Sequence, residues 1–254
     1  MAFYMSTKTG SEEAKPVHFR MENLMHGDCL ELMKGIPVGS VDMVMTDPPY
    51  EMFLQKSLKR LKSGMLRGDE RKFQEELKSE GLTVGFDVSV FLGLCLKLFS
   101  KKQQFCGVFT CSTKQLIQYI TWAESNKLQY GVGVWNKTNP APLCNHKYLN
   151  DIEYWVYIKG NKSKILGNYH SKSMVYTSQI NKKDKKAFEH PTCKPVELME
   201  KFLINHTVEG GNVLDPFMGS GTTGVACKNL NRSFVGIELD EVHFNTAQAR
   251  INYL

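Results

Sequence analysis

Residues 212–240, NVLDPFMGSGTTGVACKNLNRSFVGIELD, constrain the fold more than any other part of this sequence. A β-prone run, a glycine-rich turn, a helix-prone run, a second β-prone run and a terminal acid follow in that order, which predicts a strand–helix–strand unit of a parallel sheet. Gly219 and Gly221 would allow a tight turn and let backbone N–H groups approach a ligand at the start of the helix. Glu238 ends the second strand, where a carboxylate can accept hydrogen bonds from both ribose hydroxyls. Together these features predict a site for an adenosine-containing ligand.

The glycine-rich turn leaves two classes of ligand open. Residues 219–224 also satisfy the pattern G-x-G-x-x-G, so a nicotinamide dinucleotide competes with other adenosine ligands. A single match of this pattern discriminates poorly between them. The choice has to come from another part of the chain.

Most of the remaining chain alternates helix and strand patterns, which favours an α/β fold with a largely parallel sheet and crossover helices. At 254 residues, of which 42% are hydrophobic, the chain can bury one such core and carry a smaller insertion. Asp28 could cap a helix that runs through Lys34. We predict strands over 41–46, 105–110, 129–135, 152–158, 212–214 and 234–238, and helices over 88–99, 114–124, 195–205, 222–229 and from 241 onward.

Three segments do not follow this alternation. Residues 1–20 are polar and are predicted to be a flexible arm, and residues 51–82 are charged and are predicted to be a helical insert. Residues 145–188 form a basic segment, in which residues 159–186 carry eight Lys and one Asp and so exceed the net charge of +6 of the whole chain. Lysines mixed with aromatic side chains such as Tyr169 are suited to neutralising phosphates and contacting bases. The alternative is that this segment is only a solvated loop. Nucleic acid is therefore the partner to test first.

Composition excludes several other classes of protein. The seven cysteines are odd in number and form no C-x-x-C pair, and the histidines lack metal-ligand spacing, so we expect neither a disulfide framework nor a metal site. No apolar run approaches the roughly 18 residues that span a bilayer, and the N-terminus has no apolar stretch after a basic start. We expect a soluble intracellular protein.

The four residues after the predicted strand 41–46 suggest a reaction. An exocyclic amine of a base is a poor nucleophile because its lone pair is delocalised into the ring, and two acceptors placed on its N–H bonds would localise that pair. Asp47 and the carbonyl of Pro48 could supply these acceptors. Pro49 would stiffen the loop, and Tyr50 offers a face on which an extruded base can stack. For the quartet alone, an ordinary turn after a strand is the alternative.

The quartet and the glycine-rich turn together resemble the amino-methyltransferases of DNA, in the group whose catalytic half precedes the cofactor half along the chain. The resemblance covers about residues 22–50 and 130–250. It implies a Rossmann-like α/β methyltransferase domain over 21–254, with a seven-stranded mixed sheet, a small target-recognition appendage and S-adenosylmethionine as cofactor. The matching stretches are GDCLELM at 27–33, TDPPY at 46–50, WNKTNPAP at 135–142, EYWVYIKG at 153–160, HPTCKPVELMEKF at 190–202, DPFMGSGTT at 215–223 and GIELD at 236–240.

The resemblance also implies where the cofactor binds. Its adenine would face Asp28 and Cys29, Glu238 would hold its ribose, and the glycine-rich turn would cradle its methionine part. Thr192 and Lys194 would reach the methionine carboxylate, for which a hydroxyl and an ammonium are suitable donors. The full set of residues expected at the cofactor is Asp28, Cys29, Asp47, Thr192, Lys194, Asp215, Phe217, Gly219, Ser220, Gly221, Thr222 and Glu238.

Several of these residues have a purely structural alternative. Asp28 could serve only as a helix N-cap. Lys194 could be a surface lysine at the start of a helix, and Glu238 a solvated strand end. Phe217 could pack in the core instead of contacting the adenine.

The activity that the resemblance implies is transfer of a methyl group to N6 of adenine in a base flipped out of DNA. An aspartate at the first quartet position accompanies adenine in most of the family, and a serine accompanies cytosine. The alternatives are N4 of cytosine, an RNA base, a glutamine amide of a protein, or a non-catalytic DNA-binding decoy with the same fold. A nicotinamide-dependent dehydrogenase would leave the DPPY, HPT-x-KP and WNKTNP stretches unexplained.

The expected partner is double-stranded DNA, and a homodimer is a further expectation from the resemblance. The cell would be bacterial or phage-infected, with the protein in the cytoplasm. The resemblance connects the chain with restriction–modification, and the sequence does not reveal whether a restriction partner exists. Recognition could be shared between the insert 51–82 and the basic segment. The residues expected to contact DNA are Lys162, Lys164, Tyr169, Lys172, Lys182, Lys183, Lys185 and Lys186.

Overall fold

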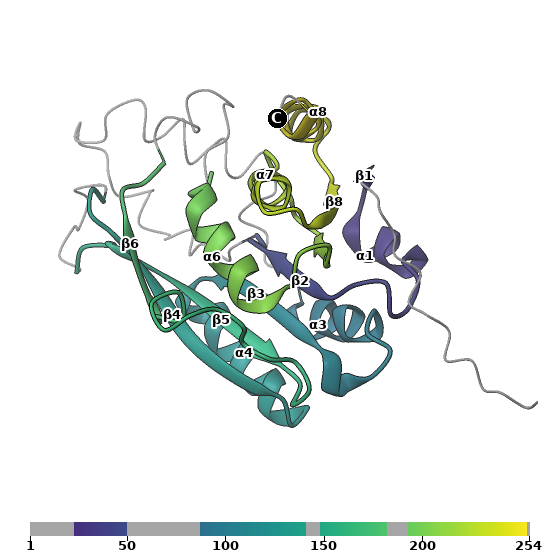
Figure 1. Cartoon of the computed structure of the whole chain (residues 1–254), viewed down its shortest axis with the longest axis horizontal. Helices are drawn as coiled ribbons and strands as arrows, with labels where there is room; N and C mark the ends of the chain where they lie inside the picture. The colour runs from purple at the N-terminus through teal and green to yellow at the C-terminus, as the bar shows by residue number, and fades with distance from the viewer. Residues whose placement is uncertain (1–22, 50–86, 141–147, 182–192, 253–254) are drawn as a thin grey trace, which may run out of the picture.

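The computed structural model shows an α/β fold of three layers, in which one sheet lies between two sets of helices (Figure 1). The expected N-terminal arm and helical insert lie outside the described residues. No helix in the described part of the chain is long and apolar enough to cross a membrane. The described residues are 23–49, 87–140, 148–181 and 193–252.

The described strands form one mixed sheet in the order β1-β8-β7-β2-β3-β5-β4-β6. The first five strands in this order run parallel, whereas β5 is antiparallel to both of its neighbours, β3 and β4. The mixed sheet that the resemblance implies is thus confirmed, with the parallel pairing predicted from the helix–strand alternation in one half and a reversed strand, β5, in the other. The strands are β1 Asn23–His26, β2 Met43–Thr46, β3 Cys106–Cys111, β4 Gln129–Lys137, β5 Ile152–Lys159, β6 Val175–Ser178, β7 Asn212–Asp215 and β8 Ser233–Glu238.

The expected seven strands are corrected to eight. Of the eight, β1 and β6 fall outside the ranges predicted as strands, and β6 forms within the basic segment 145–188. β6 pairs parallel with β4, from Val134 opposite Val175 to Lys137 opposite Ser178. The indole Nε1 of Trp135 donates a hydrogen bond to the hydroxyl of Ser178 at 2.9 Å. A four-residue run among lysines and serines is too short to show strand periodicity, so its pairing depends on β4 being already in place.

Several helices begin at polar caps, among them α1, α3 and α4. Oδ1 of Asp28 accepts a hydrogen bond from the amide of Leu30 at 2.7 Å, which confirms Asp28 as an N-cap. Ser112 and Gln115 form a capping box at the start of α4. The predicted helices are confirmed, with ends that shift by a few residues at most. The helices are α1 Cys29–Leu32, η1 Met33–Gly35, α3 Val88–Lys97, η3 Lys102–Gln104, α4 Thr113–Ser125, α6 Val196–His206, α7 Thr222–Asn229 and α8 Glu241–Asn252.

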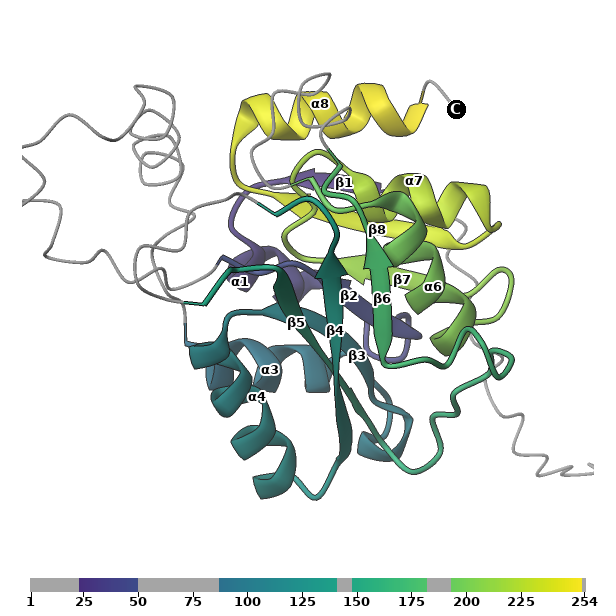
Figure 2. The same ribbon diagram turned by 90° about the vertical axis from the view of Figure 1, so that its left-hand side faces the viewer.

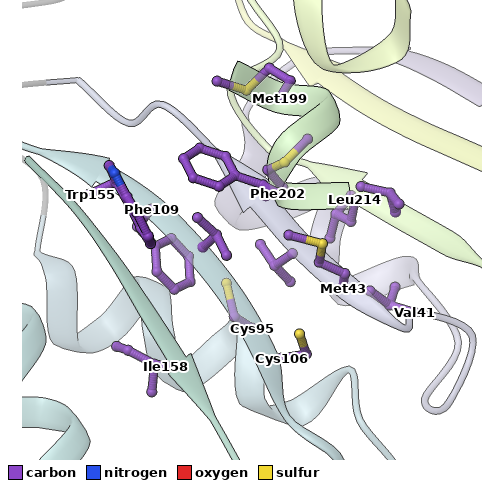
Figure 3. Close-up of a cluster of buried hydrophobic side chains, with 14 of the residues drawn as sticks. Val41, Met43, Cys95, Cys106, Phe109, Trp155, Ile158, Met199, Phe202 and Leu214 are labelled. Carbon is purple, nitrogen blue, oxygen red and sulfur yellow. The ribbon is translucent and has the colours of Figure 1, made fainter. Parts of the chain in front are cut away.

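Helices α6, α7 and α8 cover one face of the sheet, and α3 and α4 cover the other (Figures 1 and 2). Figure 3 shows Met199 and Phe202 of α6 lying over Met43 and Leu214 of the central strands, all of them buried. The rings of Trp155 and Phe202 are 4.9 Å apart. Each large apolar side chain buried in this way stabilises the fold by about 1.5–3 kcal/mol. The core therefore fixes the central strands whose ends carry the candidate site.

The parallel half of the sheet ends at β1, which lies beside β8. The register pairs Asn23 with Val235 and His26 with Glu238. Helix α8 follows β8 and packs on β1, with the rings of His26 and Phe244 5.4 Å apart. The carboxyl ends of the five parallel strands meet along one edge of the sheet, where ligands bind in folds of this kind.

Candidate active site

Asp47 follows β2 directly, near the middle of this edge. Its Oδ1 accepts a hydrogen bond from the hydroxyl of Thr110 in β3, and its Oδ2 accepts one from Nζ of Lys194 at 2.5 Å. Two residues later, the carbonyl of Pro49 accepts a hydrogen bond from Nε2 of Gln115 at 2.7 Å. A neighbouring strand and the first turn of α4 thus hold the loop after β2 in place.

A row of four charged side chains leads away from this loop. Nζ of Lys194 also donates to Oε1 of Glu153 at 2.8 Å, and Oε2 of Glu153 lies 3.0 Å from Nζ of Lys137. The side chains are largely buried, at 7% exposure for Lys194 and 24% for Asp47. We call Asp47, Lys194, Glu153 and Lys137 the charge row. Its two acids and two bases alternate, so each buried charge has an opposite neighbour.

The electrostatics of the charge row keep Glu153 and Lys194 ionised. Burial opposes ionisation of Glu153, but the ammonium groups of Lys194 and Lys137 outweigh it and lower the pKa of Glu153 to about 2. Burial likewise works against the charge of Lys194, whereas Asp47 and Glu153 raise its pKa above the ordinary value. The alternative of a surface lysine at 194 is wrong, because this side chain is buried and paired with two carboxylates.

Asp215 ends β7, next to β2, and its side chain points into the protein. Its Oδ1 accepts hydrogen bonds from the hydroxyl of Thr46 at 2.5 Å and from the amide of Phe217 at 3.0 Å. Its Oδ2 accepts one from the hydroxyl of Thr223 at 2.6 Å. Burial raises the pKa of Asp215 to about 7, although these hydrogen bonds favour the ionised form. Asp215 therefore joins the glycine-rich turn to the strand that carries Asp47.

The glycine-rich turn after β7 has the backbone that the sequence predicts. Gly219 and Gly221 adopt φ values of 50° and 80°, in the left-handed region that favours glycine. A Cβ at Gly221 would lie 3.0 Å from Cβ of Ala247 in α8. Because α7 begins at Thr222, the backbone N–H groups of its first turn are available to a ligand at the sheet edge.

Glu238 ends β8 beside this turn. Its Oε2 accepts a hydrogen bond from the amide of Gly219 at 2.8 Å, and its Oε1 accepts one from the amide of Asp240 at 2.9 Å. Burial raises the pKa of Glu238, although both amides favour the ionised form. The alternative of a solvated strand end is wrong, since this carboxylate is held by two backbone groups.

The residues expected near the cofactor adenine are placed less favourably. Cys29 is buried in the core, where burial and the adjacent Asp28 raise the pKa of its thiol to about 12. Phe217 is partly buried, with its ring 5.5 Å from that of Phe91 in α3. The packing alternative for Phe217 thus gains support, and a contact of either residue with a cofactor remains a prediction.

A buried arginine supports the turn from behind. Nη1 of Arg250 in α8 donates to the hydroxyl of Thr222 at 2.9 Å and lies 3.3 Å from the carbonyl oxygen of Ser220. Oγ of Ser220 lies 3.0 Å from Sγ of Cys193, the residue before Lys194. Ser220 and Thr222 are buried, so their side chains build the turn and leave its backbone to face a ligand.

The basic segment lies partly away from Asp47. Lys162 and Lys164 follow the carboxyl end of β5, and the amide of Lys162 donates to the carbonyl of Gln103, which precedes β3. That is the opposite end of the sheet from Asp47. Tyr169 is 88% exposed, and Lys172 follows in the same loop, which packs on α6 through Asn205. A DNA-binding role for these residues remains a prediction.

Part of the expected site cannot be placed. Tyr50 and Thr192 lie outside the described residues, as do four of the lysines expected to contact DNA: Lys182, Lys183, Lys185 and Lys186. Among the described residues, no group of histidine, cysteine or carboxylate side chains could hold a metal ion.

Sequence reasoning missed several residues that hold the site together. Glu153 and Lys137 stand in the stretches EYWVYIKG and WNKTNPAP, which resemble the family but carried no assigned role. Gln115 has a readable signal, because Ser112-x-x-Gln115 is a capping box, but the pattern does not show that its amide also reaches Pro49. Thr110 had no signal beyond its place in a strand.

Comparison with known proteins agrees with this geometry. The sequence model of the N6/N4 family of DNA methylases matches residues 41–249. The Type II methyltransferase M2.LlaDCHI of Lactococcus lactis subsp. cremoris is 27% identical over 267 residues, covering 92% of this chain and 91% of that protein. The Type II methyltransferase M.HinfI of Haemophilus influenzae is 30% identical over 257 residues, covering 91% of this chain and 68% of that protein.

A solved structure extends the comparison to three dimensions. The crystal structure of the M1.HpyAVI–SAM complex is similar to this chain with a TM-score of 0.65 and 30% sequence identity, covering 90% of this chain and 98% of that one. The match to the family spans both Asp47 and the glycine-rich turn, which the fold brings to neighbouring strand ends. The chain therefore belongs to the N6/N4 family of DNA methylases and is a DNA methyltransferase.

Proposed function

We propose that this enzyme transfers the methyl group of S-adenosylmethionine to N6 of adenine in double-stranded DNA. The observation that carries this proposal is the hydrogen bond of 2.5 Å from Thr46 to Asp215. Thr46 precedes Asp47, and Asp215 opens the glycine-rich turn. This one hydrogen bond therefore connects the residue that would accept the target amine with the turn that would bind the cofactor. A methyl donor in the turn and an amine at Asp47 would meet across neighbouring strand ends.

The chemistry at Asp47 follows from its two fixed oxygens. Thr110 donates to one carboxylate oxygen of Asp47 and Lys194 donates to the other, and each carboxylate oxygen can accept more than one hydrogen bond. An N–H of the target amine can be accepted at Asp47, and the carbonyl of Pro48 can accept the other. Both bonds hold the nitrogen pyramidal, so its lone pair is directed away from the ring for a new bond to carbon. Asp47 is then placed to accept the proton that the amine releases.

The residues of the turn fit S-adenosylmethionine. Gly219 and Gly221 keep side chains out of the turn, and Glu238 retains an acceptor position on each oxygen for the two ribose hydroxyls. When bound, the cofactor supplies a methyl group on a positively charged sulfur, whose bond to carbon breaks as the nitrogen–carbon bond forms. Lys194 stands between the turn and Asp47, where its ammonium can also be shared with the methionine carboxylate.

Adenine is favoured over cytosine by Asp47 itself, since the family uses an aspartate at this position mostly with adenine. The DNA partner would be held by phosphate contacts, because extruding a base costs about a few kcal/mol that such contacts must offset. The lysines of the basic segment are the proposed suppliers. We place the enzyme with bacterial restriction–modification methyltransferases, acting on DNA inside the cell, and a homodimer remains a prediction.

The test is to incubate the protein with unmethylated duplex DNA and methyl-labelled S-adenosylmethionine and then to identify the modified nucleoside by mass spectrometry. We expect labelled N6-methyladenine from the natural chain and none above background from Asp47→Ala. A matched control is Glu209→Ala, which removes an exposed carboxylate at the opposite end of the sheet, where it accepts a hydrogen bond from Asn231.

The outcomes separate the alternatives. N4-methylcytosine would keep the mechanism and overturn the choice of base. Undiminished transfer by Asp47→Ala would remove Asp47 from the mechanism. Transfer to RNA or protein in place of DNA would overturn the substrate.

A further inference from the structure

The charge row connects Asp47 to two sequence stretches that the proposed reaction leaves without a role. Glu153 opens the stretch EYWVYIKG on β5, and Lys137 lies in WNKTNPAP at the end of β4. Both belong to the row that ends at Asp47.

The sheet fixes the outer end of the charge row. Glu153 lies opposite Trp135 in the antiparallel pair, and Lys137 is two residues further along the same face of β4. Diagonal neighbours of this kind are within reach of long side chains. The amide of Lys137 donates to the carbonyl of Asp151 at 2.7 Å, which fixes the backbone at this point. Glu153 is therefore held in place by both strands and by Lys137.

The inner end of the charge row depends on Lys194. An ammonium group has three donors on a flexible stem, so a single carboxylate partner does not fix its position. Glu153 and Asp47 lie 2.8 Å and 2.5 Å from Nζ of Lys194 and together determine where it sits. Lys194 and Thr110 in turn hold the two oxygens of Asp47, which sets the plane of the carboxylate.

We propose that Glu153 is a positioning residue for methyl transfer, which places the ammonium of Lys194 so that Lys194 orients the carboxylate of Asp47 toward the target amine. Glu153 acts through Lys194 and does not touch the amine. This inference rests on the proposed function, because it assigns a role within that reaction.

A purely structural role makes different predictions. Buried ion pairs are weak indicators of stability, since apolar replacements of similar size are often equally stable, whereas removing one partner leaves an uncompensated charge. Loss of Glu153 would then change the unfolding temperature and leave the turnover of the folded enzyme unaltered. A positioning role lowers turnover in enzyme that is still folded.

The pH dependence offers a second readout. The groups that face Lys194 in the described residues are Asp47 and Glu153, with Lys137 beyond Glu153 and the buried thiol of Cys111 close to both acids. Asp47 and Glu153 both raise the pKa of Lys194 against burial. Without the charge of Glu153, burial has less opposition, so Lys194 loses its proton at lower pH. Activity that depends on charged Lys194 should therefore be lost at a less alkaline pH in the variant than in the natural chain.

The experiment compares Glu153→Gln with the natural chain in steady-state methylation of duplex DNA. We expect kcat to fall by about tenfold or more, with the KM values for DNA and cofactor changed by less than about threefold, because the lost interaction matters only at the reacting amine. The alkaline limb of the pH profile should move to lower pH. The matched control is Glu124→Gln on α4, whose carboxylate accepts a hydrogen bond from Tyr130 far from Asp47.

Two further variants keep the inference testable if Glu153→Gln folds poorly. Glu153→Asp retains the charge on a shorter side chain and should recover part of the lost kcat. Lys137→Gln disturbs the outer end of the charge row and should lower kcat less than Glu153→Gln. If Glu153→Gln folds and its kcat and pH profile are unaltered, the inference is overturned. If Glu153→Gln does not fold, unaltered kcat and pH profile in both Glu153→Asp and Lys137→Gln would overturn it. Absence of methyl transfer by the natural chain would instead overturn the proposed function.

Discussion

Both oxygens of Asp47 accept hydrogen bonds from the protein, yet the two donors differ in character. Lys194 brings a charge that belongs to a buried row of four, whereas Thr110 brings a neutral hydroxyl from the adjacent strand. Because both groups donate to the carboxylate of Asp47, each bond is charge-assisted, a class that contributes about 1.5–3 kcal/mol. Since the hydroxyl of Thr110 is itself neutral, it can be removed without leaving a buried charge unpaired.

Thr110→Val tests this contact, because valine has nearly the shape of threonine and lacks only the donor. We expect kcat to fall by about tenfold, which corresponds to about 1.4 kcal/mol of transition-state stabilisation. Steady-state kinetics on duplex DNA would measure it, with circular dichroism to verify folding. Thr121→Val on an exposed position of α4 is the control and should keep the natural rate. Equal rates for both variants would show that Lys194 alone orients Asp47.

At the scale of elements, the glycine-rich turn depends on α8 as much as on its own residues. Gly221 faces Ala247 so closely that a Cβ would lie 3.0 Å from the alanine Cβ. Arg250 of the same helix donates to Thr222 and lies near the carbonyl of Ser220. The turn is thus held between β7 and α8, so substitutions in α8 should alter the affinity for the cofactor.

Gly221→Ala should weaken cofactor binding, because the added methyl group would push the turn and α8 apart. An alanine at φ 80° costs about 1–2 kcal/mol in backbone strain, and the contact with Ala247 adds to that cost. Isothermal titration with S-adenosylmethionine would measure an increase in Kd of about tenfold or more. Gly93→Ala in α3 is the matched control, because a Cβ there meets nothing within 4 Å and alanine favours a helix by about 0.5–1 kcal/mol. Unchanged affinity for Gly221→Ala would show that the turn tolerates displacement.

The contact between β2 and the turn should depend on pH through Asp215. The pKa of Asp215 is raised to about 7, above its unfolded value near 4, so the folded protein holds this proton over a range in which the unfolded chain has lost it. The contribution of Asp215 to stability is therefore greatest at low pH, declines as pH rises from about 4 to about 7, and changes no further above that.

Asp215→Asn isolates this contribution from those of other acids. Asparagine cannot ionise, and Thr223 can turn its hydroxyl to accept from the new amide. We expect the difference in unfolding free energy between Asp215→Asn and the natural chain to move in favour of the variant as pH rises from 4 to 7. Urea unfolding at several pH values would measure it. A difference that is constant with pH would show that the pKa of Asp215 is not raised.

At the scale of the whole molecule, the elements that carry a local sequence signal could be predicted, and those that depend on a partner strand could not. The strand over 212–215 and the helix over 222–229 carry their own signals in apolar runs and glycines. β6 has no signal of its own, because its four residues depend on an existing partner strand. The antiparallel direction of β5 is likewise a property of the assembled sheet.

The candidate site follows the same division. Asp47 and Gly221 lie in local motifs, so their chemistry is readable from neighbours in the chain. Glu153 and Lys137 meet only through the register of β4 with β5, and Lys194 joins them from the start of α6. An ion pair across such distances in sequence has no local pattern. Sequence reasoning therefore assigned Lys194 to the cofactor carboxylate and did not foresee its contact with Asp47.

Cofactor binding should stabilise the whole fold, because β7, β8 and α8 all contribute to the turn. At a concentration of 100 times Kd, a ligand that binds only the folded state adds about 2.7 kcal/mol to the unfolding free energy. For a chain of this size we expect Tm to rise by roughly 5–10 °C with S-adenosylmethionine. Differential scanning fluorimetry would measure the shift, with NAD at equal concentration as the control. A larger shift with NAD would favour the dinucleotide alternative.

The position of α8 at the edge of the sheet has a consequence for engineering. β8 and β1 are parallel neighbours, and α8 follows β8 and packs on β1. The three elements are therefore arranged as in a strand–helix–strand crossover, except that the chain does not run from α8 into β1. A short linker from α8 to β1 would supply that connection. New ends could then be opened between β6 and α6, giving a circular permutation that places the cofactor half first. The bond from Thr46 to Asp215 would be retained, since it depends on neighbouring strands and not on their order in the chain.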